Sequence, residues 1–372
     1  MTHLVIWVTL GMGYLLSPQN TTTPQVRITF AAVGDINFGT PRSLLQRQSN
    51  PLAQVQPLLA GRDVVYGNLE TPVTSRPLRN VAFPQDCHKV ECSKTQSEYA
   101  YWYKITFWTA PSTLQILKNA GFTVLGTANN HAMDQGAIGL IETLTHLQTA
   151  QLGYTGTGRT FEEAWKPYIF EKQGVKLALL AATTLINLPV EASGPFVAFV
   201  EPQRVLQELT ARVQNLKKTV DFVVVALHFG RELEWRTARK EREWIRNLAQ
   251  AGCDLFIGAH PHVLRGISVH MSMPAFHSLG NFVFSTNAGD RIETGVVHAD
   301  FVKNGNQRRI ENVVFHPVRT DAGTLGLLPR SVSGRQARNI LNNLVYYSTP
   351  FSHPEGTLIL DGDVLRVQLP SP

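Results

Sequence analysis

The sequence predicts an α/β layered fold, and two observations support this. Short apolar runs that are typical of buried strands alternate along the chain with segments of helical period. Five of these runs end in polar residues of metal-ligating or acid–base type, close to a glycine. In open α/β sheets the ends of the strands are the usual place for a site. The same pattern therefore predicts the fold and the edge at which its chemistry is expected.

The expected elements follow from the periodicity of apolar residues. Strands are expected at 26–33, 64–66, 122–125, 177–182, 221–227, 255–257 and 273–276, within 294–318, and as a hairpin within 357–369. Helices are expected at 52–59, 111–120, 137–147, 202–217, 241–251 and 336–347. No linker after residue 25 splits the chain. We therefore expect one domain over 25–318, with a polar and then aromatic rim insertion at 74–104, and a C-terminal helix and hairpin (319–372) packed on it.

The composition is that of a globular chain, with 372 residues, 43% hydrophobic and 17% charged. The net charge is +6, and the excess is spread along the sequence. No Lys/Arg run is interleaved with aromatic residues, which argues against nucleic acid as a partner. A mild basic balance suits an anionic substrate or surface.

Residues 1–24 differ from the rest. Leu4–Leu16 is largely apolar and is followed by a polar linker. The apolar part is too short for a membrane span but has the length of a signal-peptide core, although no Lys or Arg precedes it. We interpret it as a signal peptide or N-terminal anchor, which predicts an extracytoplasmic, cell-envelope location. The alternative is a disordered or misassigned start.

Three cysteines are present. In an exported protein Cys87 and Cys92 are expected to form a small-loop disulfide. A zinc site there would need two more ligands, and only His88 is local. Cys253 is expected to be a buried, unpaired thiol.

The central motif is Asn129-Asn130-His131-Ala-Met-Asp134-Gln-Gly, where an expected strand gives way to an expected helix. Asn offers a neutral oxygen ligand, and His offers a ring nitrogen or a proton. Asp134 lies three residues after His131, on the same side of a helical turn, and can orient its ring. Taken alone, the motif could also be a turn with a helix cap.

Polar residues at the other strand ends favour a metal site. The full set is Asp35, Asn37, Asn68, Glu70, Asn130, His131, Asp134, His228, Glu232, His260 and His262. This mixture of nitrogen and oxygen ligands suits Zn, Mn or Fe and is too rich in histidine for Ca or Mg alone. It contains enough ligands for two divalent ions bridged by one carboxylate. His131, away from the metals, would protonate a leaving group while Asp134 holds its tautomer.

Six motifs now occur in a recognisable order: Gly-Asp35-Ile-Asn-Phe-Gly, Gly-Asn68-Leu-Glu70, Asn129-Asn130-His131-x-x-Asp134, His228-Phe-Gly-x-Glu232, His260-Pro-His262 and Ser278-Leu-Gly-Asn281-Phe. With them, roughly residues 27–318 resemble the CapA family of bacterial capsule-synthesis (poly-γ-glutamate synthesis) proteins. That family looks like a branch of the calcineurin-like metallophosphoesterases. The resemblance implies a four-layer α/β/β/α sandwich with a dinuclear metal site at one sheet edge.

The resemblance also implies roles for single residues. Asp35 matches a metal-binding carboxylate, Asn130 the asparagine ligand and His131 the catalytic histidine. The three remaining histidines of the motifs, His228, His260 and His262, match metal ligands.

Two positions depart from the wider phosphoesterase pattern. Asn37 stands where a metal-binding histidine is usual, and Asn68 stands where an aspartate bridges the ions. We assign the bridge to Glu70, with Asn68 as second choice, because a neutral amide bridges poorly. Asn37, Glu232 and Asn281 are expected as further ligands or as partners of a ligand histidine.

For function, the resemblance implies a role in making, exporting or anchoring an anionic envelope polymer such as poly-γ-glutamate. The reaction would be hydrolysis of a phosphoester or a γ-glutamyl amide. Arg231, Arg265 and Arg291 lie near the motifs and could receive carboxylates or phosphates. The main alternative is a non-catalytic, polymer-binding accessory subunit of a membrane-bound synthase. A phosphoesterase of nucleotides or lipids unrelated to capsule is the third possibility.

Overall fold

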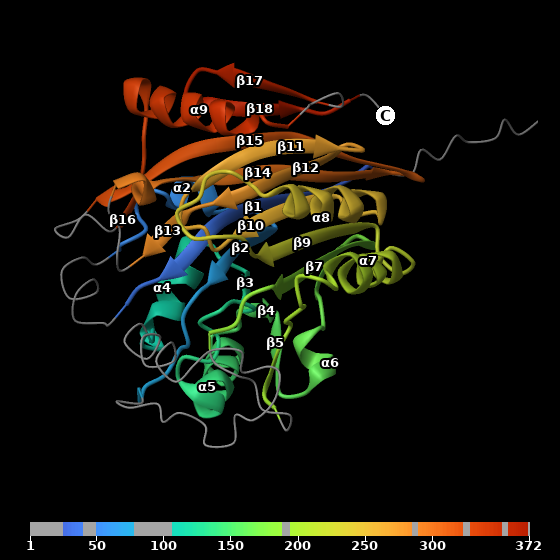
Figure 1. Cartoon of the computed structure of the whole chain (residues 1–372). Coiled ribbons are helices and arrows are strands. Elements are labelled where there is room, and N and C mark those ends of the chain that lie inside the picture. Colours follow the sequence, from blue (N-terminus) through green and yellow to red (C-terminus); the bar gives the residue numbers. More distant parts are fainter. Residues whose placement is uncertain are drawn as a thin grey trace, which may run out of the picture.

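The computed structural model describes residues 25–39, 50–77, 106–187, 194–284, 289–322, 328–351 and 356–370. Within them two large sheets form the framework, with helices around them (Figure 1). The structure confirms the mixed α/β class. The finer order of four layers stays a prediction. The N-terminal segment 1–24, most of the expected rim insertion, and the pair Cys87 and Cys92 lie outside the described residues.

The larger sheet has ten strands. Its order is β17 (Thr357–Asp361), β18 (Val364–Gln368), β15 (Gln307–Ala322), β14 (Glu293–Asn304), β1 (Val26–Asn37), β2 (Val64–Leu69), β3 (Val124–Gly126) and β4 (Gly153–Thr155), with β13 (Asn281–Phe284) on β1 and β16 (Leu328–Ser331) on β15. The strands β1, β2, β3 and β4 run parallel, so β1, β2 and β3 end at the same edge.

The second sheet has six strands, in the order β11 (Leu264–His270), β12 (Met273–Leu279), β10 (Leu255–Ala259), β9 (Phe222–His228), β7 (Val175–Thr183) and β6 (Tyr168–Lys172). Its strands β7, β9, β10 and β12 are parallel. A small separate sheet pairs β5 (Thr157–Gly158) with β8 (Phe196–Val197).

The helices are α2 (Gln56–Leu59), α4 (Ser112–Ala120), α5 (Gly136–Thr149), α6 (Phe161–Ala164), α7 (Val205–Leu216), α8 (Arg239–Gln250) and α9 (Gly334–Ser348), with a short 3-10 turn, η2 (Gly289–Ile292). Among the described residues, none of the helices combines the length and apolar character that crossing a bilayer requires.

Alternate residues of β1 serve two different cores. Ile28 and Phe30 belong to the cluster that includes the second sheet, whereas Ala31 and Val33 belong to the cluster that includes α4. This two-residue alternation is what a strand buried on both faces requires. The aromatic rings of Phe222 on β9 and Phe301 on β14, 5.2 Å apart, connect the two sheets directly.

The C-terminal elements join the same framework. β18 pairs with β15, with Phe315 opposite Leu365, and Figure 1 shows α9, β17 and β18 together at one end of the molecule. Four apolar residues of α9 are fully buried: Ala337, Ile340, Leu341 and Leu344. Cys253 is a buried free thiol, as expected.

Each expected strand and helix overlaps an observed one, but several bounds differ. The helix expected at 52–59 is helical only at 56–59, after a series of turns. β1 continues to Asn37, four residues beyond the expected end, because its last residues pair with β13. The unexpected elements are the strands β4, β5, β6, β8, β11, β13 and β16 and the helix α6; all but β6 and β11 are four residues or fewer.

Candidate metal centre

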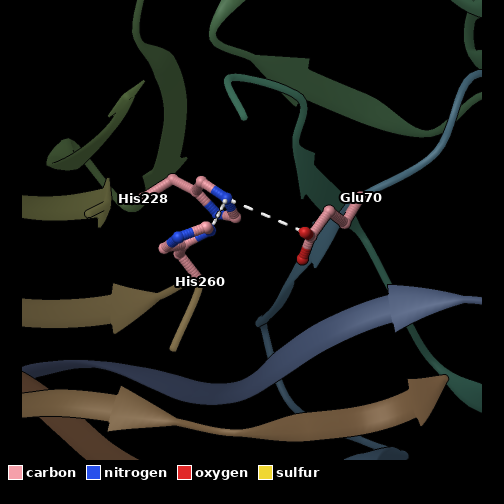
Figure 2. A group of neighbouring side chains, drawn as sticks. All are labelled: Glu70, His228 and His260. Atoms are coloured by element: carbon pink, nitrogen blue, oxygen red, sulfur yellow. Dashed lines mark hydrogen bonds and ion pairs between the residues drawn. The ribbon is translucent and has the colours of Figure 1, made fainter. Parts of the chain in front are cut away.

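The candidate site forms where strands of both large sheets end. Asp35 lies near the end of β1, and Glu70 directly follows β2. From the second sheet, His228 is the last residue of β9 and His260 directly follows β10. Figure 2 shows Glu70 facing His228 and His260 across the gap between these elements.

Glu70 is the most unusual member of the site. It is fully buried, and neither carboxylate oxygen has a hydrogen-bond partner among the described residues. Its Oε1 lies 3.8 Å from His228 Nε2, 3.8 Å from His262 Nε2 and 4.0 Å from His131 Nε2. Burial, and then the negative charges of Asp35 and Glu232, raise the pKa of Glu70 well above its usual range. A buried carboxylate with no partner is costly unless a cation or a proton neutralises it.

The spacing around Glu70 fits a shared cation better than direct hydrogen bonds. Separations of 3.8–4.0 Å are too long for hydrogen bonds. Ligands bound at about 2.0–2.2 Å lie roughly 3–4 Å apart around one ion. Three groups offer ligand atoms that all lie within 4.8 Å of one another: Glu70, His228 and His260; Asp35, Glu70 and His262; and Glu232, His260 and His262.

Asp35 is held in place by neighbours from three separate parts of the chain. Asn68 Nδ2 donates to Asp35 Oδ1 at 2.8 Å, and the backbone N–H of His260 donates to Oδ2 at 3.2 Å. The Asp35 N–H donates to Gly280 O at 2.9 Å. That contact needs glycine at position 34, because a Cβ there would lie 1.9 Å from Gly280 O. These contacts aim the carboxylate before any ligand arrives.

His228 and His260 are held as neutral imidazoles. Burial, and then neighbouring histidines, lower the pKa of each well below its usual range. His228 Nε2 lies 2.8 Å from Asn130 Oδ1 and 3.1 Å from His260 Nδ1. Neutral imidazole is the form that binds metal ions, so burial favours in both rings the form that a metal ion would need.

His262 is oriented by Asn281. The Nδ1–H of His262 donates to Asn281 Oδ1 at 2.8 Å, which leaves Nε2 facing Glu70. Burial lowers the pKa of His262, but the hydrogen bond and charge of Asp35 outweigh it and raise that pKa overall. A partner on one ring nitrogen that fixes the direction of the other is the usual support of a ligand histidine.

His131 and Asp134 form a close pair beside this cluster. Asp134 Oδ2 lies 2.6 Å from His131 Nδ1, and it also accepts the backbone N–H of Phe107 at 2.6 Å. Burial raises the pKa of Asp134, and its contacts with His131 offset this only in part. The Phe107 ring packs on the His131 ring with centroids 4.1 Å apart. The pair directs His131 Nε2 towards Glu70.

The His260-Pro-His262 segment has a constrained backbone. His260 has φ +96° and His262 has φ +59°. Residues other than glycine rarely adopt positive φ angles. Such residues cost of order 1–3 kcal/mol each and cluster at functional sites.

The remaining predicted site residues are Asn37, Arg231, Arg265 and Arg291. Asn37 is fully buried, and its Oδ1 accepts the Gly39 N–H at 2.9 Å, so it closes a turn after β1. Arg231 is exposed and Arg291 half-buried. Arg265 is 1% exposed, and its guanidinium is occupied by Glu241 and by two backbone carbonyls. An anionic substrate could reach Arg265 only by displacing those partners.

Two residues to which the sequence analysis assigned no role complete the site. Asn129 donates to Leu69 O at 2.8 Å and accepts the His131 N–H at 3.1 Å, which joins the ends of β2 and β3. Its place beside Asn130 was a local signal that could have identified it. Phe107 carries no sequence signal, because it lies far from the other motifs and acts through its backbone and its ring.

A family model described as "Bacterial capsule synthesis protein PGA_cap" matches residues 29–286. The chain belongs to this family. The matched range includes every residue of the candidate metal centre. The resemblance read from the motifs is thereby confirmed at the level of the capsule-synthesis family.

Among relatives in this family, the chain is 30% identical over 298 residues to "PGA biosynthesis protein CapA" of Bacillus subtilis, covering 77% of this chain and 72% of the relative. It is 29% identical to "Capsule biosynthesis protein CapA" of Bacillus anthracis, covering 75% and 65% of the two chains. A "Probable polyglutamine synthesis accessory protein" of Mycobacterium tuberculosis is 23% identical, covering 59% and 55%.

Solved structures that the chain matches include a "Putative 5'-Nucleotidase" from Staphylococcus aureus in complex with alpha-ketoglutarate, with 13% identity, 86% of this chain and 58% of that chain covered, and a TM-score of 0.48. A structure described as a novel phosphatase of Mycoplasma pneumoniae covers 80% of this chain and 95% of that chain, with 13% identity and a TM-score of 0.45. Scores of this size assign no activity.

Proposed function

We propose that this capsule-synthesis family member is a metal-dependent hydrolase that acts on an anionic envelope polymer or on a phosphoester linked to its synthesis, export or anchoring. One observation supports this most directly. The Glu70 carboxylate is fully buried without a hydrogen-bond partner among the described residues, and it faces three imidazole nitrogens at 3.8–4.0 Å. This donor set fits a divalent cation.

The proposed ligands are Asp35, Glu70, Asn130, His228, His260 and His262, with Glu70 in the bridging position. Two ions of Mn, Zn or Fe would supply Lewis-acid charge and lower the pKa of a bound water. Asn68 supports Asp35 rather than bridging, because its amide already donates to Asp35 Oδ1.

His131 is proposed as the residue that moves a proton. Asp134 holds its Nδ1, so its Nε2 is the atom that can give a proton to a leaving group. The buried Asp134 carboxylate stabilises the imidazolium form, and the Phe107 ring limits the orientations of the imidazole. Exposed Arg231 and half-buried Arg291 are proposed to receive carboxylates or phosphates of the substrate.

The test combines metal analysis with turnover. Purified protein from manganese-supplemented medium is expected to hold about two divalent ions per chain and to hydrolyse members of a phosphoester and γ-glutamyl panel. His131→Ala is expected to keep its metal and to lose about 10²–10⁴-fold in kcat. Protein without metal, or a His131→Ala variant with wild-type turnover, would contradict the proposal.

A second candidate is a non-catalytic, polymer-binding accessory subunit of a membrane synthase. The name of the Mycobacterium tuberculosis relative, an accessory protein of polyglutamine synthesis, favours it. So does Asn68, a neutral amide beside Asp35 at the position assigned to a bridging aspartate. This candidate predicts retention of intact polymer with no turnover by the metal-loaded wild type. The hydrolase proposal predicts turnover that depends on His131.

A further inference from the structure

Among the described residues, Arg265 is the largest side chain that is fully buried. The hydrogen bonds of its guanidinium lead to one segment and one helix. Its Nε donates to Glu234 O at 2.7 Å and its Nη2 to Arg231 O at 3.1 Å. Its Nη1 donates to Glu241 Oε2 at 3.2 Å, and the same oxygen accepts the Ala238 N–H at the start of α8. The guanidinium therefore connects β11, the segment 230–234 and α8.

The segment 230–234 is also fixed at its other side. The Leu233 N–H donates to Pro261 O at 2.9 Å, between the two histidines of the metal centre. Leu233 has φ +59°, and Gly230 has φ +99° and lies so close to Arg265 that a Cβ there would be 2.5 Å from Nη1. A segment with two unusual backbone conformations keeps its shape only when its surroundings impose it.

The segment presents Glu232 to the metal centre. Glu232 is exposed, yet its carboxylate lies within 4.8 Å of ligand atoms of His260 and His262. The carbonyl groups that Arg265 holds belong to the residue before Glu232 and to the second residue after it. The two hydrogen bonds therefore hold the backbone on both sides of Glu232.

We propose that Arg265 is a positioning residue, whose buried guanidinium fixes segment 230–234 so that Glu232 supplies an outer carboxylate to the His260 and His262 side of the metal centre. This inference rests on the proposed metal centre. Three different nitrogens of the planar guanidinium each meet one acceptor. The three donors of lysine radiate from a single nitrogen, so lysine does not reproduce this arrangement. Glu232 would bind the ion from the solvent side, and the other carboxylates from the buried side.

Manganese titration of the metal-stripped full chain by calorimetry tests this inference. Glu232→Gln is expected to weaken the weaker manganese site about 10–100-fold, and Arg265→Lys about 3–10-fold. If Arg265 acts through Glu232, adding Arg265→Lys to Glu232→Gln should cause no further loss. Arg242→Lys on α8, where the arginine contacts Pro350 O, is the matched control and should leave the affinity unchanged.

Hydrogen exchange supplies an independent readout: amides of 231–236 should exchange faster in Arg265→Lys. If that variant does not fold, Glu241→Gln removes the negative charge that pairs with the guanidinium and should weaken manganese binding in the same direction. Two results would overturn the inference. In the first, Arg265→Lys lowers the manganese affinity equally in wild type and in Glu232→Gln. In the second, Arg265→Lys lowers thermal stability but leaves the manganese affinity unchanged. Wild-type protein that binds no manganese would instead overturn the proposed metal centre.

Discussion

Oε1 of Glu70 lies 3.8 Å from Nε2 of His262, and both atoms point into the same buried space. His262 cannot turn away, because its Nδ1–H is bonded to Asn281. Glu70 has no alternative partner among the described residues. The metal-free protein therefore keeps a poorly compensated carboxylate at the centre of its ligand set, and such a group should make stability depend on metal and on pH.

Glu70→Gln should stabilise the metal-free protein at neutral pH. The folded-state pKa of Glu70 is raised, so its contribution to stability is complete below the unfolded-state pKa of about 4.5 and is lost as pH rises. In EDTA at pH 7.5 we expect the variant to be more stable than wild type by on the order of 1–3 kcal/mol, with a smaller difference at pH 5. Urea unfolding followed by circular dichroism measures this.

In manganese, wild type should be more stable than Glu70→Gln, because the variant lacks the charge that is proposed to bind the ion. Glu243→Gln, an exposed change on α8, is the control and should have no such effect. A variant that is less stable than wild type in EDTA at pH 7.5 would show that Glu70 is already well satisfied without metal.

The sequence predicted that these residues would lie near one another, because each proposed ligand follows a strand that is recognisable locally. Asp35, Glu70, His228 and His260 all lie at ends of apolar runs, and parallel strands bring such ends together. The pairing of Asp35 with Asn281 on β13 could not be predicted in the same way. It joins residues far apart in the chain, and β13 is only four residues long.

The contacts of Arg265 could not be predicted for a related reason. Arginine is seldom buried, and a sequence read locally gives no sign that Arg231, Glu234 and Glu241 will supply acceptors. Phe107 was missed because its contribution is a backbone N–H and a ring face, which any sequence position can offer.

A pair of histidines outside the site should make stability fall in mild acid. His316 Nε2 lies 3.0 Å from His298 Nδ1, and Arg62 Nη2 lies 2.8 Å from the same atom. Burial, with the positive charge of Arg62, lowers the pKa of His298 to about 4 although Leu58 O and Asp300 oppose this. Burial, with His298, Arg62 and Arg366, lowers the pKa of His316 to about 4.

These folded-state pKa values lie below the unfolded-state value of about 6.5. The contribution of the two histidines to the free energy of unfolding is therefore complete above pH 6.5 and is lost as pH falls towards 4. Allowing for partial solvent exposure, we expect protonation of the two histidines to lower the free energy of unfolding by on the order of 1–3 kcal/mol. Urea unfolding in EDTA at pH 7.5 and 5 should show a smaller pH dependence for His298→Gln than for wild type. His146→Gln on α5 is the control, and identical pH dependence in all three proteins would contradict the prediction.

The close approach of β1 to Gly280 should make position 34 intolerant of any side chain. A Cβ at Gly34 would lie 1.9 Å from Gly280 O, so Gly34→Ala must separate the backbones that aim Asp35. We expect a loss of about 3 kcal/mol or more in the free energy of unfolding, together with weaker manganese binding. Gly174→Ala provides the comparison, because that glycine has φ +77° and open space around it. It should lose only about 1 kcal/mol and keep its metal affinity. Equal losses from the two substitutions would mean that the contact at Gly34 relaxes without consequence.

Asn68→Asp should have opposite effects with and without metal. Asn68 Nδ2 donates to Asp35 Oδ1 at 2.8 Å, so the substitution replaces a hydrogen bond with two adjacent carboxylates. In EDTA at pH 7.5 we expect the free energy of unfolding of Asn68→Asp to be lower than that of wild type by on the order of 1–3 kcal/mol. With manganese, the added charge should raise affinity about tenfold or more, since ligand charge is a main determinant of cation affinity. Thermal unfolding in EDTA and in excess manganese should therefore show a melting temperature below wild type in the first and above it in the second.

Asn129→Asp separates this effect from a general sensitivity of the site to added charge. Asn129 donates to Leu69 O and Asn68 Oδ1, so an aspartate there loses both hydrogen bonds and should be destabilised in both conditions. Because Asn68 lies against both Asp35 and His228, only a charge at position 68 is placed to repel Asp35 in the empty site and to attract an ion in the filled one. If Asn68→Asp is destabilised relative to wild type by the same amount in EDTA and in manganese, the ion does not lie near Asn68. Its ligands would then be Glu70 and the histidines, without Asp35.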